Sequence, residues 1–185
     1  MKKKLFIDVD GVITNTIKRF CDIYNKKYAT HPNFKPADWT KVESWNFTDE
    51  CPLLKTVDEV EEIFESYEMY DNPEFLDGSV DALFDLSNTY DITIVTMGSA
   101  INLGNKFEVL KDKIPFVDFI GIDNFKHKDK RKVDMTGSIF IDDVSKNLQT
   151  SNALIKICFG EVKPWNEDWT GKRCFDWNQI TTLLL

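Results

Sequence analysis

Two short apolar runs, each ending in a pair of acidic residues, constrain the fold of this chain more than any other feature. Residues 5–7 (Leu-Phe-Ile) lead into Asp8-Val9-Asp10-Gly11, and residues 139–141 (Ile-Phe-Ile) lead into Asp142-Asp143. Short continuous apolar runs are typical of strands buried in a parallel sheet. Ligand sites of open parallel sheets lie at the carboxyl ends of the strands. We therefore expect four carboxylates to gather at one edge of a sheet.

The first acidic pair predicts a cation site. Asp8 and Asp10 are one residue apart, so alternation along a strand would point both side chains the same way. Two like charges held so close repel each other, which favours a divalent cation between them. Gly11 allows the backbone to turn sharply at this point. A strand that ends in a solvated Asp-Gly turn is the plainer alternative, and the second acidic pair makes it the weaker one.

Strand and helix alternate along most of the chain, which favours a parallel sheet with helices on both faces. Ser79 and Ser99 are predicted helix N-caps. The predicted strands cover residues 4–9, 91–96, 117–122, 138–142 and 154–159. The predicted helices between and after them cover residues 79–89, 100–112, 144–150 and 177–184. The fold class is therefore α/β with three layers.

The segment between the first two strands is unusually long. Some 80 residues separate Asp10 from the strand that begins near residue 91, whereas a crossover needs little more than about a dozen. Apolar residues recur at helical spacing over 15–29, and a capping box at Thr56 opens a second helix that reaches about residue 67. We therefore divide the chain into an α/β core, residues 1–14 and 76–185, and an inserted helical cap, residues 15–75.

Composition narrows the functional classes. The net charge of −8 argues against a general nucleic-acid binder, which would carry a basic face. No apolar stretch is long enough to cross a membrane. The four cysteines lack the Cys-x-x-Cys spacing of zinc and redox sites. We expect a cytoplasmic protein without a nucleic-acid or membrane partner, and a homodimer stays open.

These motifs, in this order, resemble those of the haloacid dehalogenase-like (HAD) superfamily of phosphohydrolases. The superfamily carries an Asp-x-Asp-Gly-x-x-Thr motif after its first strand, then a Thr or Ser that ends a strand, a lysine, and an acidic pair. The matching residues here are Asp8, Asp10, Gly11 and Thr14, then Thr96, and finally Asp142 and Asp143. The resemblance implies a Rossmann-like parallel sheet of strand order 3-2-1-4-5, with a small helical cap inserted after the first strand.

The resemblance also implies roles for the acids. Asp8 would be the nucleophile that forms an aspartyl-phosphate, and Asp10 would protonate the leaving group and then activate water. Mg²⁺ is the implied cofactor, held by Asp8, by the backbone carbonyl of Asp10, and by the Asp142–Asp143 pair. Adjacent carboxylates cannot easily both reach one ion, and we favour Asp143 as the direct ligand.

Phosphate binding is implied for a second group of residues. Thr96 would donate a hydrogen bond to a phosphate oxygen, and the backbone N–H groups of Met97, Gly98 and Ser99 would add to an anion nest at a helix start. The phosphate lysine belongs to the basic run 126–132. In the deoxyribonucleotidase branch of the superfamily this lysine precedes the acidic pair by ten residues, which selects Lys132 over Lys130.

Chain length, cap position and lysine spacing are most similar to the 5′(3′)-deoxyribonucleotidases, which remove phosphate from deoxynucleoside monophosphates. The resemblance thus implies a Mg²⁺-dependent phosphomonoesterase of small phosphorylated substrates. Trp45 of the cap loop is our candidate base contact, since a base stacked on an aromatic ring gains about 1–3 kcal/mol. The vertebrate-type members carry an aromatic residue where this chain has Thr16, which leaves base preference open.

Three alternatives stay open. One is a HAD phosphatase that acts on another small ester or on the 3′-phosphate ends of nucleic acids, which need a more basic groove. Another is a phospho-receiver domain, in which the phosphorylated residue on the third strand would be Asp118 or Asp123. The last is an inactive binding protein of the same fold, against which the complete motif set argues.

Overall fold

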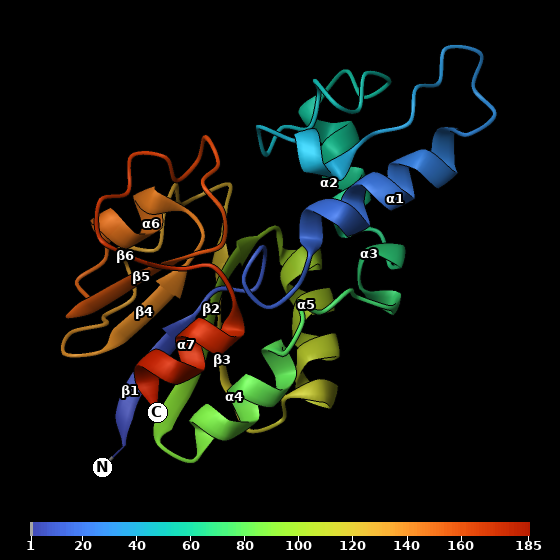
Figure 1. Cartoon of the computed structure of the whole chain (residues 1–185). Helices are drawn as coiled ribbons and strands as arrows, with labels where there is room; N and C mark the ends of the chain where they lie inside the picture. Colours follow the sequence, from blue (N-terminus) through green and yellow to red (C-terminus); the bar gives the residue numbers. More distant parts are fainter. Residues whose placement is uncertain (1) are drawn as a thin grey trace.

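The computed structural model describes residues 2–185, which form one six-stranded parallel sheet flanked by helices (Figure 1). The order across the sheet is β3-β2-β1-β4-β5-β6. The predicted order 3-2-1-4-5 is confirmed, and a short sixth strand that we did not predict extends the sheet beyond β5. The strands are β1 (Lys3–Ile7), β2 (Tyr90–Gly98), β3 (Asp118–Asp123), β4 (Ile139–Asp142), β5 (Ile155–Phe159) and β6 (Lys172–Cys174).

Every predicted helix is present within two residues of its expected ends. The helices are α1 (Thr16–Tyr28), α2 (Val57–Glu65), α3 (Glu68–Asp71), α4 (Ser79–Ser87), α5 (Ala100–Lys113), α6 (Ser145–Thr150) and α7 (Trp177–Leu184). The short helix α3 and a single 3₁₀ turn at Trp39–Lys41 were not predicted. None of the helices within residues 2–185 is both long and apolar enough to cross a membrane.

Two of the three N-caps predicted from the sequence are present in the structure. The capping box between Thr56 and Glu59 is present at the start of α2, and the Ser99 hydroxyl accepts a hydrogen bond from the Asn102 N–H (3.3 Å) at the start of α5. The prediction of Ser79 as a cap was wrong by one position. Gly78 takes the N-cap place with a left-handed φ of +74°, a conformation that suits glycine, and Ser79 becomes the first buried residue of α4.

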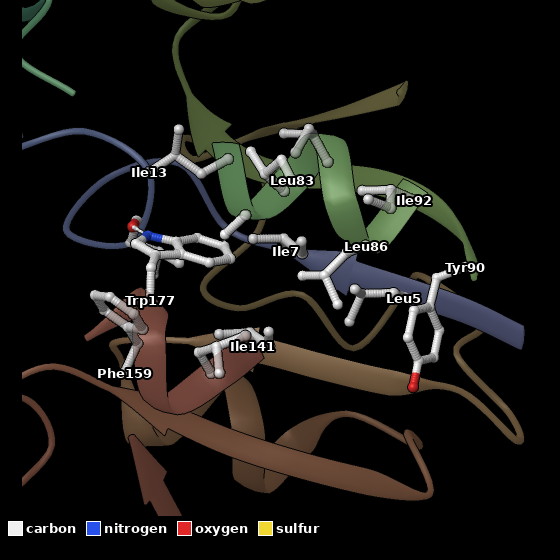
Figure 2. Close-up of a cluster of buried hydrophobic side chains, with 14 of the residues drawn as sticks. Leu5, Ile7, Ile13, Leu83, Leu86, Tyr90, Ile92, Ile141, Phe159 and Trp177 are labelled. Carbon is white, nitrogen blue, oxygen red and sulfur yellow. Dashed lines mark hydrogen bonds between the residues drawn. The ribbon is translucent and has the colours of Figure 1, made fainter. Parts of the chain in front are cut away.

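The core lies on both faces of the sheet. Register aligns Ile94, Ile7, Ile141 and Ile157 across β2, β1, β4 and β5, and these side chains belong to the cluster that α4 and α7 cover. Figure 2 shows how Leu83 and Leu86 of α4 lie over Ile7 and Leu5 of β1. The opposite face carries a smaller cluster, which includes Phe6, Val95, Phe140 and, from α6, Leu148.

A separate apolar cluster joins the helices of the inserted segment. Its buried members come from residues 20–70 and include Phe20 and Tyr24 of α1, Ile63 of α2 and Tyr70 of α3. In Figure 1 these helices gather beyond the end of β1, apart from the sheet. We propose on this basis that residues 15–75 form the cap and that residues 1–14 and 76–185 form the core.

Trp177 of α7 packs in the core and donates a hydrogen bond to the loop that follows β1. Its indole is buried, its ring lies 5.6 Å from that of Phe159 between centroids, and its Nε1–H donates to the carbonyl oxygen of Val12 (2.8 Å). Figure 2 shows the ring between Phe159 and the segment that carries Ile13. The packing of the C-terminal helix thus supports the loop of Asp8 and Asp10 from behind.

We expect Trp177→Ala to lower the free energy of unfolding by about 3–5 kcal/mol, because a large buried ring leaves a cavity that the core cannot refill. Trp177→Phe keeps most of the packing but loses the N–H donor, so it should cost only about 1–2 kcal/mol. Urea unfolding followed by circular dichroism measures both. Equal losses would show that the hydrogen bond to Val12, and not the packing, is the larger contribution.

Candidate active site

The two acids of the first motif lie on a tight loop, not on the strand itself. The Asp8 N–H donates to the Ile141 carbonyl (3.0 Å), which holds the start of the loop against β4. The Val9 carbonyl then accepts bonds from the N–H groups of residues 12, 13 and 14. Asp8 and Asp10 thus lie on either side of Val9, where this turn begins.

Gly11 permits this loop for two reasons. Its φ is +72°, a left-handed conformation that side chains disfavour. A Cβ atom at this position would also lie 2.8 Å from Oδ2 of Asp143. The glycine therefore lets the first acidic loop approach the acidic pair at the end of β4.

Three carboxylates meet where β1 and β4 end. Asp8, Asp142 and Asp143 are all buried, and each offers one oxygen within 4.8 Å of the others. Burial raises the pKa of Asp8 to about 7, and burial followed by repulsion from Asp142 and Asp8 raises the pKa of Asp143 well above its usual range. Buried carboxylates of this kind are stabilised by a bound cation.

The two carboxylates of the acidic pair differ in how many of their oxygens accept hydrogen bonds. Asp142 accepts hydrogen bonds from the Val144 N–H (2.8 Å) and from Nδ2 of Asn147 (3.1 Å), and it pairs with a lysine. Oδ2 of Asp143 accepts from Nε1 of Trp165 (2.9 Å), whereas its Oδ1 is buried without a partner among residues 2–185. Hard carboxylate oxygens suit Mg²⁺, so the residues present fit the implied ion, and Oδ1 of Asp143 is free to bind it.

The structure places Lys130, not Lys132, against the acids. Lys130 Nζ lies 2.7 Å from Oδ1 of Asp8 and 2.6 Å from Oδ2 of Asp142, and its side chain is 1% exposed. Burial lowers the pKa of Lys130, but the two carboxylates outweigh it and raise that pKa above the usual value.

Lys132 is exposed and does not line the cavity beside Asp8. Our prediction of Lys132 is therefore corrected, for a reason that lies in the loop. The Val133 N–H donates to the Lys130 carbonyl (3.1 Å), and Asp129 pairs with Arg131. This turn directs residue 130 inward and leaves residues 131 and 132 at the surface, which a count along the sequence cannot show.

Lys106 of α5 is a second buried lysine, and the sequence analysis missed it. Its Nζ contacts Oδ2 of Asp10 and donates to the hydroxyl of Thr96 (3.1 Å) and the carbonyl of Met97 (2.9 Å). The Thr16 hydroxyl donates to the other oxygen of Asp10 (2.8 Å). Asp10 is thus held between α1 of the inserted segment and α5. Thr96 is fully buried, and its hydroxyl accepts a hydrogen bond from Lys106.

A cavity of about 360 Å³ opens in front of these groups, within the range of about 300–1,000 Å³ of small-molecule sites. Of the predicted residues, Thr96, Ser99, Asp142 and Lys132 lie outside the lining. Trp45 approaches Trp165 with ring centroids 5.6 Å apart, so a loop of the inserted segment meets a loop of the core above Asp143. The predicted residues that line the cavity are Asp8, Asp10, Asp143, Met97, Gly98 and Trp45.

A family model matches residues 2–185, nearly the whole chain, and it describes the "5′ nucleotidase, deoxy (Pyrimidine), cytosolic type C protein" family. The chain belongs to this family. Among curated proteins, none matches the chain. Our recognition of a HAD-type nucleotidase family is confirmed.

Solved structures of HAD-superfamily hydrolases share the fold of this family member. A haloacid dehalogenase-like hydrolase from Streptococcus pneumoniae is 15% identical, with a TM-score of 0.67 and coverage of 100% of this chain and 99% of that one. A HAD-superfamily hydrolase of subfamily IA from Geobacter sulfurreducens is 12% identical, with a TM-score of 0.64 and coverage of 100% and 97%.

A third structure comes from Bacillus subtilis and is named as a HAD-type hydrolase bound to magnesium; it is 12% identical, with a TM-score of 0.60 and coverage of 99% and 98%. The chain thus belongs to a family of 5′ nucleotidases, which are phosphatases, and has the fold of HAD-superfamily hydrolases.

Proposed function

We propose that the protein is a Mg²⁺-dependent 5′(3′)-deoxyribonucleotidase, which hydrolyses deoxynucleoside monophosphates to deoxynucleoside and phosphate. One observation carries the proposal. Asp8 lies at the wall of the cavity, paired with the buried Lys130 and next to the unpartnered Oδ1 of Asp143. A carboxylate nucleophile, a cation for the phosphoryl oxygens and a free metal-binding oxygen are the parts that phosphoryl transfer requires.

The reaction would proceed in two displacements at phosphorus. An oxygen of Asp8 attacks the phosphoryl group, the ester P–O bond breaks, and Asp10 gives its proton to the departing sugar oxygen. Asp10 then takes a proton from water, the water oxygen attacks the aspartyl-phosphate, and the bond between phosphorus and Asp8 breaks. Bound Mg²⁺ would neutralise charge on the phosphoryl oxygens. Lys130 holds Asp8 in place, while Thr16 and Lys106 orient the carboxyl of Asp10.

The choice of a nucleotide substrate is supported by two aromatic residues of the cavity and by the family. Trp45 and Phe64 line the same cavity as the acids, and aromatic rings stack on nucleobases. The family description names deoxy and pyrimidine nucleotides. We further propose a cytoplasmic location, in line with the word "cytosolic" in that description. A homodimer stays a prediction.

Phosphate release from a panel of monophosphates, with Mg²⁺ and with a chelator, tests the proposal. We expect kcat/KM for deoxynucleoside monophosphates to exceed that for sugar phosphates by about tenfold or more. Only the nucleotides carry a base that can stack on the aromatic residues of the cavity. Chelation should lower every rate by roughly a hundredfold or more, and added Mg²⁺ should restore it.

Two outcomes would contradict this proposal in different ways. Activity that survives chelation would remove the metal from the mechanism. A sugar phosphate as the best substrate would favour the alternative of a phosphatase for another small ester.

A further inference from the structure

One part of the cavity wall carries hydrogen-bond acceptors from both the inserted segment and the core. Glu61 lies on α2, and Asn124 follows β3; both line the cavity that contains Asp8 and Asp10. Nδ2 of Asn124 donates to Oε1 of Glu61 (3.4 Å). The two side chains thus form a polar pair in the wall of the same cavity as the reacting groups, which none of the predicted roles uses.

The pair leaves acceptor capacity free. A carboxylate can only accept hydrogen bonds, so the amide nitrogen of Asn124 must face Glu61. This orientation leaves Oδ1 of Asn124 as an acceptor, and that oxygen is buried without a partner within the described part of the chain. Glu61 itself is half-buried in the cavity wall. Buried acceptors without donors are costly.

Trp45 supplies the complementary donor elsewhere in the cavity. Its Nε1–H is buried and finds no acceptor among residues 2–185. A base that offers a carbonyl to Trp45 would satisfy this donor, and both cytosine and uracil carry such a carbonyl. Trp45 therefore does not distinguish the two bases, whereas Glu61 and Asn124 differ in what they accept.

We propose that Glu61 and Asn124 are specificity-determining residues that select a leaving group with a hydrogen-bond donor, the exocyclic amino group of a base. The inference rests on the proposed nucleotidase function. An amino group would donate to Oδ1 of Asn124 and to the carboxylate of Glu61. A carbonyl in the same place would bring a third acceptor and leave Oδ1 of Asn124 unpaired. The site should therefore prefer an amino-bearing pyrimidine over its keto counterpart.

The test compares dCMP with dUMP, which differ only in an amino group against a carbonyl at one ring position. We expect kcat/KM of the wild-type protein to favour dCMP by roughly tenfold to a hundredfold. In Glu61→Gln the new amide can donate as well as accept, so the ratio should fall by about tenfold. Asn124→Ala, which removes the free Oδ1, should also lower the ratio and serves if Glu61→Gln does not fold.

The matched control is Glu62→Gln, the same change one residue along α2. Glu62 is exposed, pairs with Lys27 at the surface and does not line the cavity, so the dCMP to dUMP ratio should stay at the wild-type value. Measuring a ratio within each enzyme cancels any change in folding or in the chemical step.

The outcomes separate this inference from the function it rests on. Nucleotide turnover with a ratio near one, or a ratio that neither variant changes, would overturn the inference alone. In Glu61→Gln, kcat/KM for CMP could fall relative to that for dCMP while kcat/KM for dUMP stays unchanged. That result would assign the donor to a sugar hydroxyl and overturn the assignment to the base. Turnover of para-nitrophenyl phosphate without turnover of any nucleotide would overturn the proposed nucleotidase function, and the inference with it.

Discussion

Asp8→Asn is expected to lower turnover of every phosphate ester by roughly a thousandfold or more, since an amide cannot attack phosphorus as a carboxylate does. The protein should remain folded. Burial raises the pKa of Asp8 to about 7, far above that of a free aspartate, so in the metal-free protein the ionised form destabilises the fold increasingly as pH rises from about 4 to beyond 7. An uncharged asparagine of the same size removes this destabilisation. Phosphate release and thermal melting in a chelator measure the two effects.

Asp118→Asn provides the matched control for this change. Asp118 is exposed at the start of β3 and lies outside the active-site cavity, so its replacement should leave turnover within about twofold. The comparison also tests the phospho-receiver alternative, in which the third strand carries the phosphorylated residue. A phosphoryl adduct found on the peptide of Asp118 instead of that of Asp8, or near-normal turnover in Asp8→Asn, would reject the aspartyl-phosphate mechanism at Asp8.

Lys130→Met is expected to have the second large effect, on stability and on activity together. The substitution keeps much of the chain length but leaves Asp8 and Asp142 buried without their shared cation. Removing one partner of a buried pair costs about 3–5 kcal/mol, which urea unfolding in a chelator would measure. Loss of a positive group beside the phosphoryl oxygens should also lower kcat/KM by roughly a hundredfold or more.

Lys132→Met is the matched control, because it removes a lysine only two residues from Lys130. The side chain of Lys132 is exposed, so this variant should change the free energy of unfolding by less than about 0.5 kcal/mol and should retain most activity. Both variants remove one positive charge from the same loop, which cancels any effect of net charge. If Lys132→Met were the inactive variant, the spacing rule from the relatives would be correct and the inward position of Lys130 would not matter for function.

The sequence predicted those features that depend on short-range patterns. Apolar runs identified the strands β1 to β5, and the capping box at Thr56 identified the start of α2. Asp8, Asp10, Asp142 and Asp143 were predicted to converge because parallel strands end at one edge. Three of them do, whereas the carboxylate of Asp10 pairs with Lys106 and Thr16. Those arguments need no knowledge of how loops fold. They failed for β6, whose three residues (Lys-Arg-Cys) carry no apolar run.

Side chains delivered by loops and helix faces were harder to predict. Lys130 and Lys132 belong to the same basic run, and only the turn between Lys130 and Val133 decides which one points inward. Lys106 did have a sequence signal. It follows Asn102 and precedes Leu110 at intervals of four, so all three lie on the buried face of α5. Trp165, which binds Asp143 from the loop after β5, had none.

Helix α5 belongs to the core and to the inserted segment at once. Its Leu110 lies in the main core cluster, while Val109 packs against the cluster of residues 20–70. The amides of Asn102 and Asn105 donate to the carbonyls of Phe64 (2.9 Å) and Glu65 (3.2 Å) at the end of α2. A version of this enzyme trimmed of residues 15–75 would therefore expose an apolar seam and orphaned amides along α5. The inserted segment is joined to the core through α5, and grafting a different one would require redesigning α5 with it.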